Sequence, residues 1–272
     1  MNEKLLVVDV SGLAYRAFHS MRELSFEGLP TAVSYGVLRD VLYLRDLFYT
    51  NRFVFVFDRG KSLRNAIYPQ YKEHRKDAIT QDAEKVALRK SLRVQIRRFH
   101  DDVLPELGYR NVISAYGYES DDLMAKLCED YPQQEMMLIT SDHDMFQLLG
   151  KNVMMWSPSK KRVITAELFR ADWGISPTQW ADVLALAGCA TDNVKGVHGV
   201  GPKTAIKFLR GDLVKGKAFE AIVNSNELWK SNLELVRLPF KGTPSWDLQD
   251  DDVTERRWSK VTRSLGITSL RY

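Results

Sequence analysis

The stretch LLVVD at residues 5–9 decides the fold, and two later stretches, FVFVFD at 53–58 and MLITSD at 137–142, repeat its form. Each is a short run of apolar, β-branched or aromatic residues that ends close to an aspartate. Such runs are typical of strands that are buried on both faces of a sheet. We therefore predict strands at 5–8, 53–57 and 136–139.

Helical patterns separate these runs. Apolar residues recur at helical spacing from Tyr35 to Phe48, a second long helix is expected after residue 82, and a short one near 255–265. Strands that alternate with helices favour a parallel sheet covered on both faces, because parallel strands are usually connected by helices. The sequence therefore predicts an α/β fold.

The composition is that of an ordinary globular protein: of 272 residues, 44% are hydrophobic and 27% are charged. No apolar run reaches the roughly 20 residues that cross a bilayer, so we expect no membrane partner. Cys128 and Cys189 are too few for a disulfide framework and lack the spacing of a zinc site. We expect a reducing, cytoplasmic location.

Acidic side chains follow the predicted strands and begin one predicted helix. The first group is Asp9, Asp58 and Asp142, with Asp144 two residues later. The second group, in the segment GYESDD at 117–122, is Glu119, Asp121 and Asp122. The carboxyl ends of parallel strands share one edge of a sheet, and ligands bind there.

Each of these acids taken singly has an ordinary structural interpretation. An aspartate after a strand is commonly a turn residue, and acids at a helix start are commonly caps. Seven carboxylates together, without a matching histidine or cysteine cluster, favour hard cations such as magnesium or manganese. Two such ions about 4 Å apart would clamp a scissile phosphate and activate water.

Basic residues are concentrated in one part of the chain. Residues 72–98 carry nine lysines and arginines against four acids, whereas the whole chain has a net charge of only +4. Four of them are spaced by four residues along the predicted helix: Lys85, Arg89, Arg93 and Arg97. This basic stripe is interpreted either as a polyanion-binding surface or as a solvated helix face.

A glycine-rich turn follows in the last third of the chain. The string GVHGVG at 196–201, followed by PKTA at 202–205, has the form of a helix-hairpin-helix. Glycines let the backbone approach a DNA phosphate, Pro202 suits the first turn of a helix, and Lys203 adds a point charge. The alternative is a tight turn between packed helices. The full string favours a DNA-binding hairpin.

These motifs together resemble the structure-specific 5′-nuclease (flap endonuclease) family, which includes the nuclease domain of bacterial DNA polymerase I and free-standing phage 5′-exonucleases. Six stretches between residues 7 and 205 match in family order: VVDVSGLAYRAFHS at 7–20, VFVFDRG at 54–60, YPQYKEHRKD at 68–77, GYESDDLMA at 117–125, LITSDHDMFQLL at 138–149 and TDNVKGVHGVGPKTA at 191–205.

The resemblance implies a PIN-like, mostly parallel central sheet with helices on both faces. It also implies a nuclease core at 1–180 that includes a helical arch at about 70–105. A helix-hairpin-helix region with C-terminal helices would follow at 181–272. A free-standing monomer in a bacterial or phage-infected cell, acting in DNA replication or repair, is expected.

The resemblance further implies two magnesium or manganese ions. The first would be held by Asp9, Asp58, Glu119, Asp121 and Asp122. The second would be held by Asp142, Asp144 and Asp192, with Asp121 shared. Lys72 and Arg75 match the family's basic pair at the scissile phosphate and are expected to act as catalytic residues.

Contacts to DNA are also implied. Arg16, with Phe18 and His19, would contact the substrate strand. Tyr68 and Tyr71 would stack on a base, although core packing is the alternative for both. The hairpin would bind duplex DNA through Gly199, Gly201, Lys203 and Thr204. Backbone carbonyls near Val197 and Val200 would bind a potassium ion.

The sequence departs from the family pattern at two positions. Val10 stands where the family has glycine. Cys189 stands where the second-metal motif has its first aspartate, and cysteine is a soft ligand that magnesium does not favour. We expect a second metal site that is weakened, held through water or occupied only with substrate present, unless Cys189 is a small buried apolar residue at the end of a helix over 185–190.

The resemblance thus predicts a metal-dependent nuclease that cleaves DNA at 5′ flaps and free 5′ ends, with RNA–DNA primer junctions as a further substrate. One alternative is a flap- or duplex-DNA-binding protein whose catalysis is impaired by Cys189. Another is a PIN-like ribonuclease, which shares the acidic edge but gives no reason for the glycine hairpin.

Overall fold

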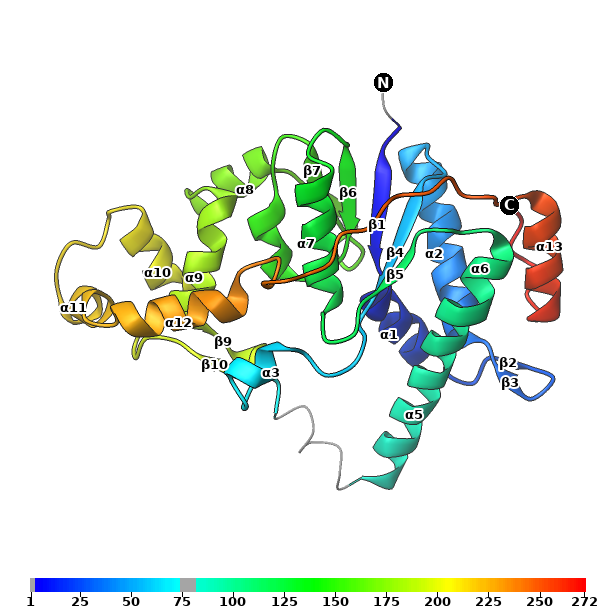
Figure 1. The fold of residues 1–272 in the computed structure, drawn as a ribbon, viewed down its shortest axis with the longest axis horizontal. Coiled ribbons are helices and arrows are strands. Elements are labelled where there is room, and N and C mark those ends of the chain that lie inside the picture. Colours follow the sequence, from blue (N-terminus) through cyan, green and yellow to red (C-terminus); the bar gives the residue numbers. More distant parts are fainter. Residues whose placement is uncertain (1–2, 74–81) are drawn as a thin grey trace.

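A six-stranded sheet forms the centre of the computed structural model, which describes residues 3–73 and 82–272 (Figure 1). Its strands, in spatial order, are β5 (Val112–Ser114), β4 (Phe53–Phe57), β1 (Leu5–Asp9), β6 (Met136–Ile139), β7 (Val153–Ser157) and β8 (Arg162–Ile164). All neighbouring strands are parallel except β8, which is antiparallel to β7 at the edge. The three predicted strands are therefore confirmed as three adjacent central strands.

Both faces of the sheet are buried, as the sequence predicts. Leu6 and Val8 belong to one apolar cluster, whereas Leu5 and Val7 belong to the other. Successive side chains of a strand point to opposite faces, so a strand covered on both sides needs apolar residues at every position. This explains why β1 has an unbroken apolar run up to Asp9 rather than an alternating pattern.

One face of the sheet is covered by helices from the N-terminal half and by the last helix of the chain. These are α1 (Val10–Met21), α2 (Ala32–Phe48), α5 (Ala83–Arg98), η1 (Phe99–Val103), α6 (Leu104–Leu107) and α13 (Glu255–Ser264). The long helix predicted after residue 82 is thus confirmed, and Asp82 caps it by accepting from two backbone N–H groups. Outward-facing residues of α5 carry the basic stripe.

The other face is covered by helices from the second half of the chain (Figure 1). These are α7 (Ser120–Asp130), η2 (His143–Leu148), α8 (Ala166–Trp173), η3 (Pro177–Gln179) and α9 (Trp180–Ala187). Residues on both sides of the predicted domain boundary at 180 share one apolar cluster, because Val183 and Val197 are buried together with Val7.

A two-stranded ladder, one 3-10 helix and three α-helices follow α9. They are β9 (Gly188–Cys189), η4 (Ala190–Asp192), β10 (Val194–Lys195), α10 (Pro202–Leu209), α11 (Lys217–Val223) and α12 (Asn226–Val236). The expected helix over 185–190 is wrong at its C-terminal end. The helix stops at Ala187, Gly188 adopts a positive φ of 77°, and Cys189 pairs with Val194 in an antiparallel ladder.

The C-terminal segment returns from α12 across the molecule to α13, passing α7 and β5 (Figure 1). Tyr131, directly after α7, donates to the carbonyl of Trp246, and the side chain of Asn111 exchanges hydrogen bonds with Gln249. Two smaller elements lie outside the layers: a hairpin of β2 (Ser25–Phe26) with β3 (Leu29–Pro30), and α3 (Arg64–Ile67). Within the described ranges, no helix is long and apolar enough to cross a membrane.

Candidate active site

Three aspartates lie at the carboxyl end of the sheet, where the register places them side by side. Asp9 is the last residue of β1 and is paired with Val56, two residues before Asp58. Asp142 follows β6 by three residues. Thr140, which lies between the end of β6 and Asp142, donates to Asp9 Oδ2 at 3.2 Å. The parallel register therefore brings together acids that are far apart in sequence, as expected for this edge.

The start of α7 adds further carboxylates to the same edge. Glu119 is the N-cap residue of α7, and the backbone N–H of Ser120 donates to Asp58 Oδ1 at 2.9 Å. Ser11 at the start of α1 donates to Asp58 Oδ2 at 2.6 Å. The capping interpretation and the site interpretation thus both apply here, because α7 begins at the edge of the sheet where the aspartates lie.

Three of the aspartates have strongly raised pKa values. Burial, followed by the charge of Asp58, raises the pKa of Asp9 to about 7. Burial and the charge of Asp142 raise the pKa of Asp121 well above its usual range, and raise that of Asp144 to about 7. Like charges held close together disfavour ionisation. These aspartates therefore lie close together, and the lysines and arginines of the described residues do not fully offset their negative charge.

Asp144, Cys189 and Asp192 form a second group beside the first. One ligand atom from each residue lies within 4.8 Å of the other two. The Cys189 thiol is 3.0 Å from Thr191 Oγ1, and burial followed by the charge of Asp144 raises its pKa to about 11. The thiol is therefore protonated at neutral pH. Seven carboxylates make up what we call the acidic cluster: Asp9, Asp58, Glu119, Asp121, Asp142, Asp144 and Asp192.

Lys72 contacts this cluster directly. Its Nζ donates to Glu119 Oε1 at 2.6 Å and lies 3.6 Å from Asp192 Oδ1, and its backbone N–H donates to the Asp192 carbonyl at 2.9 Å. The predicted catalytic lysine is thus placed among the acids. Its predicted partner Arg75 lies outside the described residues.

Tyr71 is placed differently from the stacking prediction. Its side chain is only 3% exposed and packs in a small apolar cluster with Ala185 and Leu235. Its hydroxyl lies 2.8 Å from Glu119 Oε2 and 2.9 Å from Asp192 Oδ2. A buried ring offers no face to a base, so the packing alternative applies to Tyr71. Tyr68 packs partly buried against the same cluster.

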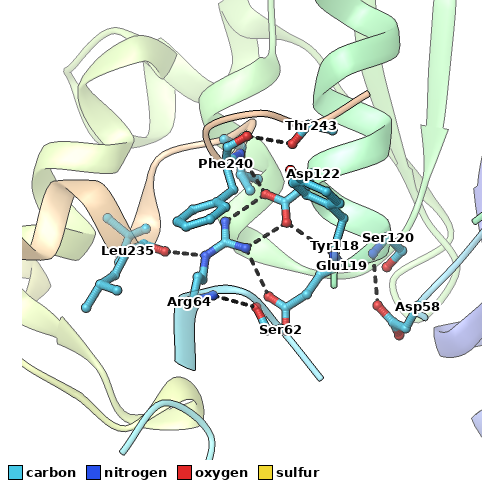
Figure 2. Close-up of polar contacts among 12 residues, drawn as sticks. Asp58, Ser62, Arg64, Tyr118, Glu119, Ser120, Asp122, Leu235, Phe240 and Thr243 are labelled. Carbon is cyan, nitrogen blue, oxygen red and sulfur yellow. Dashed lines mark hydrogen bonds and ion pairs between the residues drawn. The ribbon is translucent and has the colours of Figure 1, made fainter. Parts of the chain in front are cut away.

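Asp122 also departs from its predicted place. Its side chain is fully buried, and its two oxygens accept from Arg64 Nη1 and Nη2 at 2.6 and 2.7 Å (Figure 2). The backbone N–H groups of Phe240 and Glu119 donate to the same carboxylate. With its oxygens engaged inside the protein, Asp122 is a partner of Arg64 and is not part of the acidic cluster.

The predicted strand contacts on α1 divide between surface and core. Arg16 is partly exposed and forms an ion pair with Asp40 at 2.7 Å. His19 is exposed and lies against the ring of Tyr15. Phe18 is 2% exposed within the core, so its predicted contact with a substrate strand is wrong, because its ring faces the sheet.

The glycine hairpin is open on its outer side. A Cβ at Gly199 or at Gly201 would meet no atom of the described residues within 4 Å, and Gly199 has a positive φ of 75°. Lys203 is exposed and Thr204 half-buried at the start of α10, whereas the side chains of Val197 and Val200 point into the core. The hairpin is thus packed on its inner side by valines and accessible at its glycines.

Several residues of the site are not among the predicted ones. Ser11 and Thr140 donate to the strand-end aspartates, and Arg64 holds Asp122. Ser11 and Thr140 lie inside the quoted motifs VVDVS and LITSD, so their nearness to an aspartate is a signal in the sequence. Arg64 carries no such signal, because its partner lies 58 positions further along the chain.

The chain is similar in sequence to known 5′-3′ exonucleases. Residues 4–174 match the model of the family "5′-3′ exonuclease, N-terminal resolvase-like domain". The 5′-3′ exonuclease of Aquifex aeolicus is 34% identical over 210 residues, which cover 76% of this chain and 68% of that protein. DNA polymerase I of Thermus thermophilus is 32% identical over 248 residues, which cover 88% of this chain but only 28% of the polymerase.

Solved structures show the same fold. The 5′-exonuclease of bacteriophage T5, solved with zinc, superposes with a TM-score of 0.75 at 24% identity, covering 87% of this chain and 90% of that one. Flap endonuclease-1 from Methanococcus jannaschii superposes with a TM-score of 0.56 at 14% identity, covering 98% and 92%. These likenesses confirm the predicted PIN-like α/β fold. The family model matches most of the chain, and the Aquifex aeolicus enzyme is 34% identical over more than two thirds of both proteins, so the chain belongs to the 5′-3′ exonuclease family and is a nuclease.

Proposed function

We propose that this nuclease depends on divalent metal ions and hydrolyses phosphodiester bonds at 5′ flaps and free 5′ ends of DNA. The observation that carries the proposal is the acidic cluster at the carboxyl end of the sheet, with the raised pKa values of Asp9 and Asp144. Carboxylates that repel one another to this extent form a fitting site for hard cations, because the cations would offset the repulsion.

The residues present divide into two ligand sets. The first consists of Asp9, Asp58, Glu119 and Asp121. The second consists of Asp142, Asp144 and Asp192, with Asp121 shared and the Cys189 thiol at its margin. Asp122 is left out of the first set because its carboxylate is fully buried and accepts from Arg64 and two backbone N–H groups, whereas Glu119 is partly exposed. Magnesium or manganese bound there would lower the pKa of a water molecule and stabilise charge on the leaving oxygen.

The protein's own groups would position and neutralise the substrate. Lys72 lies close enough to the acidic cluster to pair with a phosphate held there, and a fixed ammonium stabilises charge that develops on phosphate oxygens. Arg75 is proposed to share this role. No side chain is required as a nucleophile in this scheme.

DNA would be held at two places beyond the cluster. The accessible glycines of the hairpin, with Lys203 and Thr204, would contact duplex phosphates at the start of α10, and the carbonyls near Val197 and Val200 would bind potassium. The basic stripe on α5 would face the single-stranded 5′ end in the proposed arch at 70–105. A solved complex of the bacteriophage T5 flap endonuclease contains DNA and metal ions, which supports DNA as the substrate here.

Cleavage of a labelled 5′-flap duplex tests the proposal. We expect magnesium- or manganese-dependent release of the flap with a 5′-phosphate on the product, and no release with a chelator. DNA binding without cleavage would favour the impaired-catalysis alternative. Preferential cleavage of a matched RNA would favour the ribonuclease alternative.

The variant Asp121→Asn is the control that ties this activity to the cluster. Because Asp121 is proposed to contact both metal ions, its loss should abolish cleavage while leaving flap-DNA affinity in calcium unchanged. Single-turnover cleavage and a binding titration on the same preparation measure both effects. Near-normal turnover by this variant would contradict the two-metal assignment.

A further inference from the structure

A buried arginine lies between the acidic cluster and the C-terminal segment. Arg64, on α3, is only 2% exposed. Its Nη1 and Nη2 donate to the two oxygens of Asp122, and its Nε donates to the carbonyl of Leu235 at 2.7 Å. The guanidinium also lies 4.7 Å from the centre of the Phe240 ring. Figure 2 shows Arg64 between Leu235 and Phe240 on one side and Glu119 and Asp122, at the start of α7, on the other.

The same guanidinium reaches a proposed metal ligand. Arg64 Nη1 lies 3.4 Å from Glu119 Oε2, the oxygen that also accepts from the Tyr71 hydroxyl. Lys72 holds the other oxygen, Oε1. Glu119 therefore has a defined orientation, and Arg64 is its contact on the buried side. Asp122 in turn accepts from the backbone N–H of Glu119 at 3.2 Å.

Residues 235–240 contact Arg64 on the side away from Glu119. The same residues are hydrogen-bonded close to the second ligand set. Gln147, three residues after Asp144, donates to the carbonyl of Val236 at 3.1 Å and accepts from the N–H of Leu238 at 2.9 Å. This stretch is thus anchored to η2 on one side and to Arg64 on the other. Through Arg64, Glu119 is therefore linked to a segment that lies more than a hundred residues later in the sequence.

We propose that Arg64 is a positioning residue for the metal site, which orients Glu119 through a buried ion pair with Asp122 and through residues 235–240. The proposal rests on the proposed function, because it takes Glu119 as a metal ligand. An arginine is required, since its planar fork matches a carboxylate with two parallel bonds and leaves Nε for the Leu235 carbonyl. A lysine could pair with Asp122 but could not make all of these contacts.

Stability alone does not account for this ion pair. Two buried charges lose their hydration, and replacing both by apolar side chains of similar volume is often neutral or stabilising. Residues that hold a metal ligand from behind, by contrast, commonly change metal affinity or activity by about 10- to 100-fold when they are replaced. The two roles therefore predict different results for a variant that loses both charges together.

The double variant Arg64→Met/Asp122→Leu is the main test. We expect it to fold with a lower melting temperature, because no unpaired charge is left buried but the Leu235 carbonyl and the Phe240 N–H lose their partners. Calorimetric titration of the DNA-free protein with manganese should show affinity at least about tenfold weaker than that of the wild type. The magnesium midpoint for single-turnover cleavage of a 5′ flap should rise in parallel.

Two further variants sharpen the result. Arg64→Lys keeps a cation beside Asp122, so it should remain folded, yet it should bind manganese nearly as weakly as the double variant. Tyr131→Phe is the matched control, because it removes the hydrogen bond to the Trp246 carbonyl on the same C-terminal segment without touching Glu119. It should bind manganese like the wild type.

The outcomes separate this proposal from the proposed function. Wild-type affinity and rate in the folded double variant, or in Arg64→Lys, would overturn the positioning role while leaving the metal-dependent nuclease intact. Loss of affinity in Tyr131→Phe equal to that in the double variant would also overturn it, because any loosening of the segment would then suffice. A wild-type protein that neither binds manganese nor cleaves DNA would overturn both.

Discussion

At the scale of single residues, Cys189 lies beside two acids of the second ligand set. Its thiol lies within 4.8 Å of carboxylate oxygens of Asp144 and Asp192, where a further oxygen would complete the second ligand set. We expect Cys189→Asp to shift the magnesium dependence of cleavage to lower concentration, because a carboxylate is a hard ligand. The wild type should gain more from manganese than the variant does.

The competing role of Cys189 is apolar packing, since it is 8% exposed and lies in a cluster with Ala185 and Val194. An added aspartate would then be buried without a partner. Magnesium titrations and melting temperatures of the two proteins distinguish these roles. An unchanged magnesium midpoint with a lower melting temperature would contradict the ligand role.

The raised pKa values of Asp9 and Asp144 predict how stability depends on pH. Both groups bind protons near pH 7 in the folded protein but only near pH 4 when unfolded. Their contribution to stability is therefore fully present below about pH 4 and is lost as the pH rises through about 7. The melting temperature of the metal-free protein should fall between pH 5.5 and 8.

Asp144→Asn isolates this effect, because it removes one of the raised groups. Its melting temperature in chelator should fall less steeply with pH than that of the wild type, and added magnesium should stabilise the wild type more at pH 8 than at pH 6. Parallel slopes for the two proteins would show that Asp144 does not titrate in this range.

Lys72 is predicted to act on the chemical step. Lys72→Ala should lower the single-turnover cleavage rate by a factor on the order of 10² or more, which is the usual loss for one donor to a charged transition state. Rapid-quench kinetics at saturating enzyme measures this rate apart from binding. If only the dissociation constant for DNA changed, Lys72 would be a positioning contact for the backbone.

At the scale of elements, α10 and the hairpin before it should contribute to DNA affinity and not to chemistry. Lys203, exposed at the start of α10, is expected to contact one duplex phosphate. Lys203→Ala should therefore weaken duplex binding and reduce its salt dependence by about one phosphate contact. The bond that is cut should stay the same.

A matched substitution on a neighbouring helix controls for net charge. Lys230→Ala removes an exposed lysine of α12 that pairs with Glu227 and is not part of the hairpin. It should leave the salt dependence unchanged. An identical salt slope for Lys203→Ala and the wild type would instead identify the glycine hairpin as a packing turn.

At the scale of the whole molecule, two apolar layers enclose the sheet, and the C-terminal segment crosses from one part of the protein to the other (Figure 1). Residues 235–240 contact Arg64 and Gln147, and later residues reach α7 and β5 before α13 packs on the opposite face. The last sixty residues, which carry no motif, thus contact α3 and η2 next to the site.

The sequence by itself determined the strands of the central sheet and the aspartates at their ends. A strand buried on both faces requires a continuous apolar run, and this requirement can be read locally. It also determined that α7 starts with acids, because these acids lie within one short motif. Lys72, in such a motif, is indeed placed among the acids.

Only the tertiary structure decided which acids face one another. Asp121 and Asp122 are adjacent in sequence, yet α7 turns about 100° per residue, so one side chain joins the acidic cluster and the other meets Arg64. Tyr71 and Phe18 likewise belong to the interior because of their neighbours in space. A buried group is defined by partners that come from distant segments, and neither local spacing nor residue type specifies those partners.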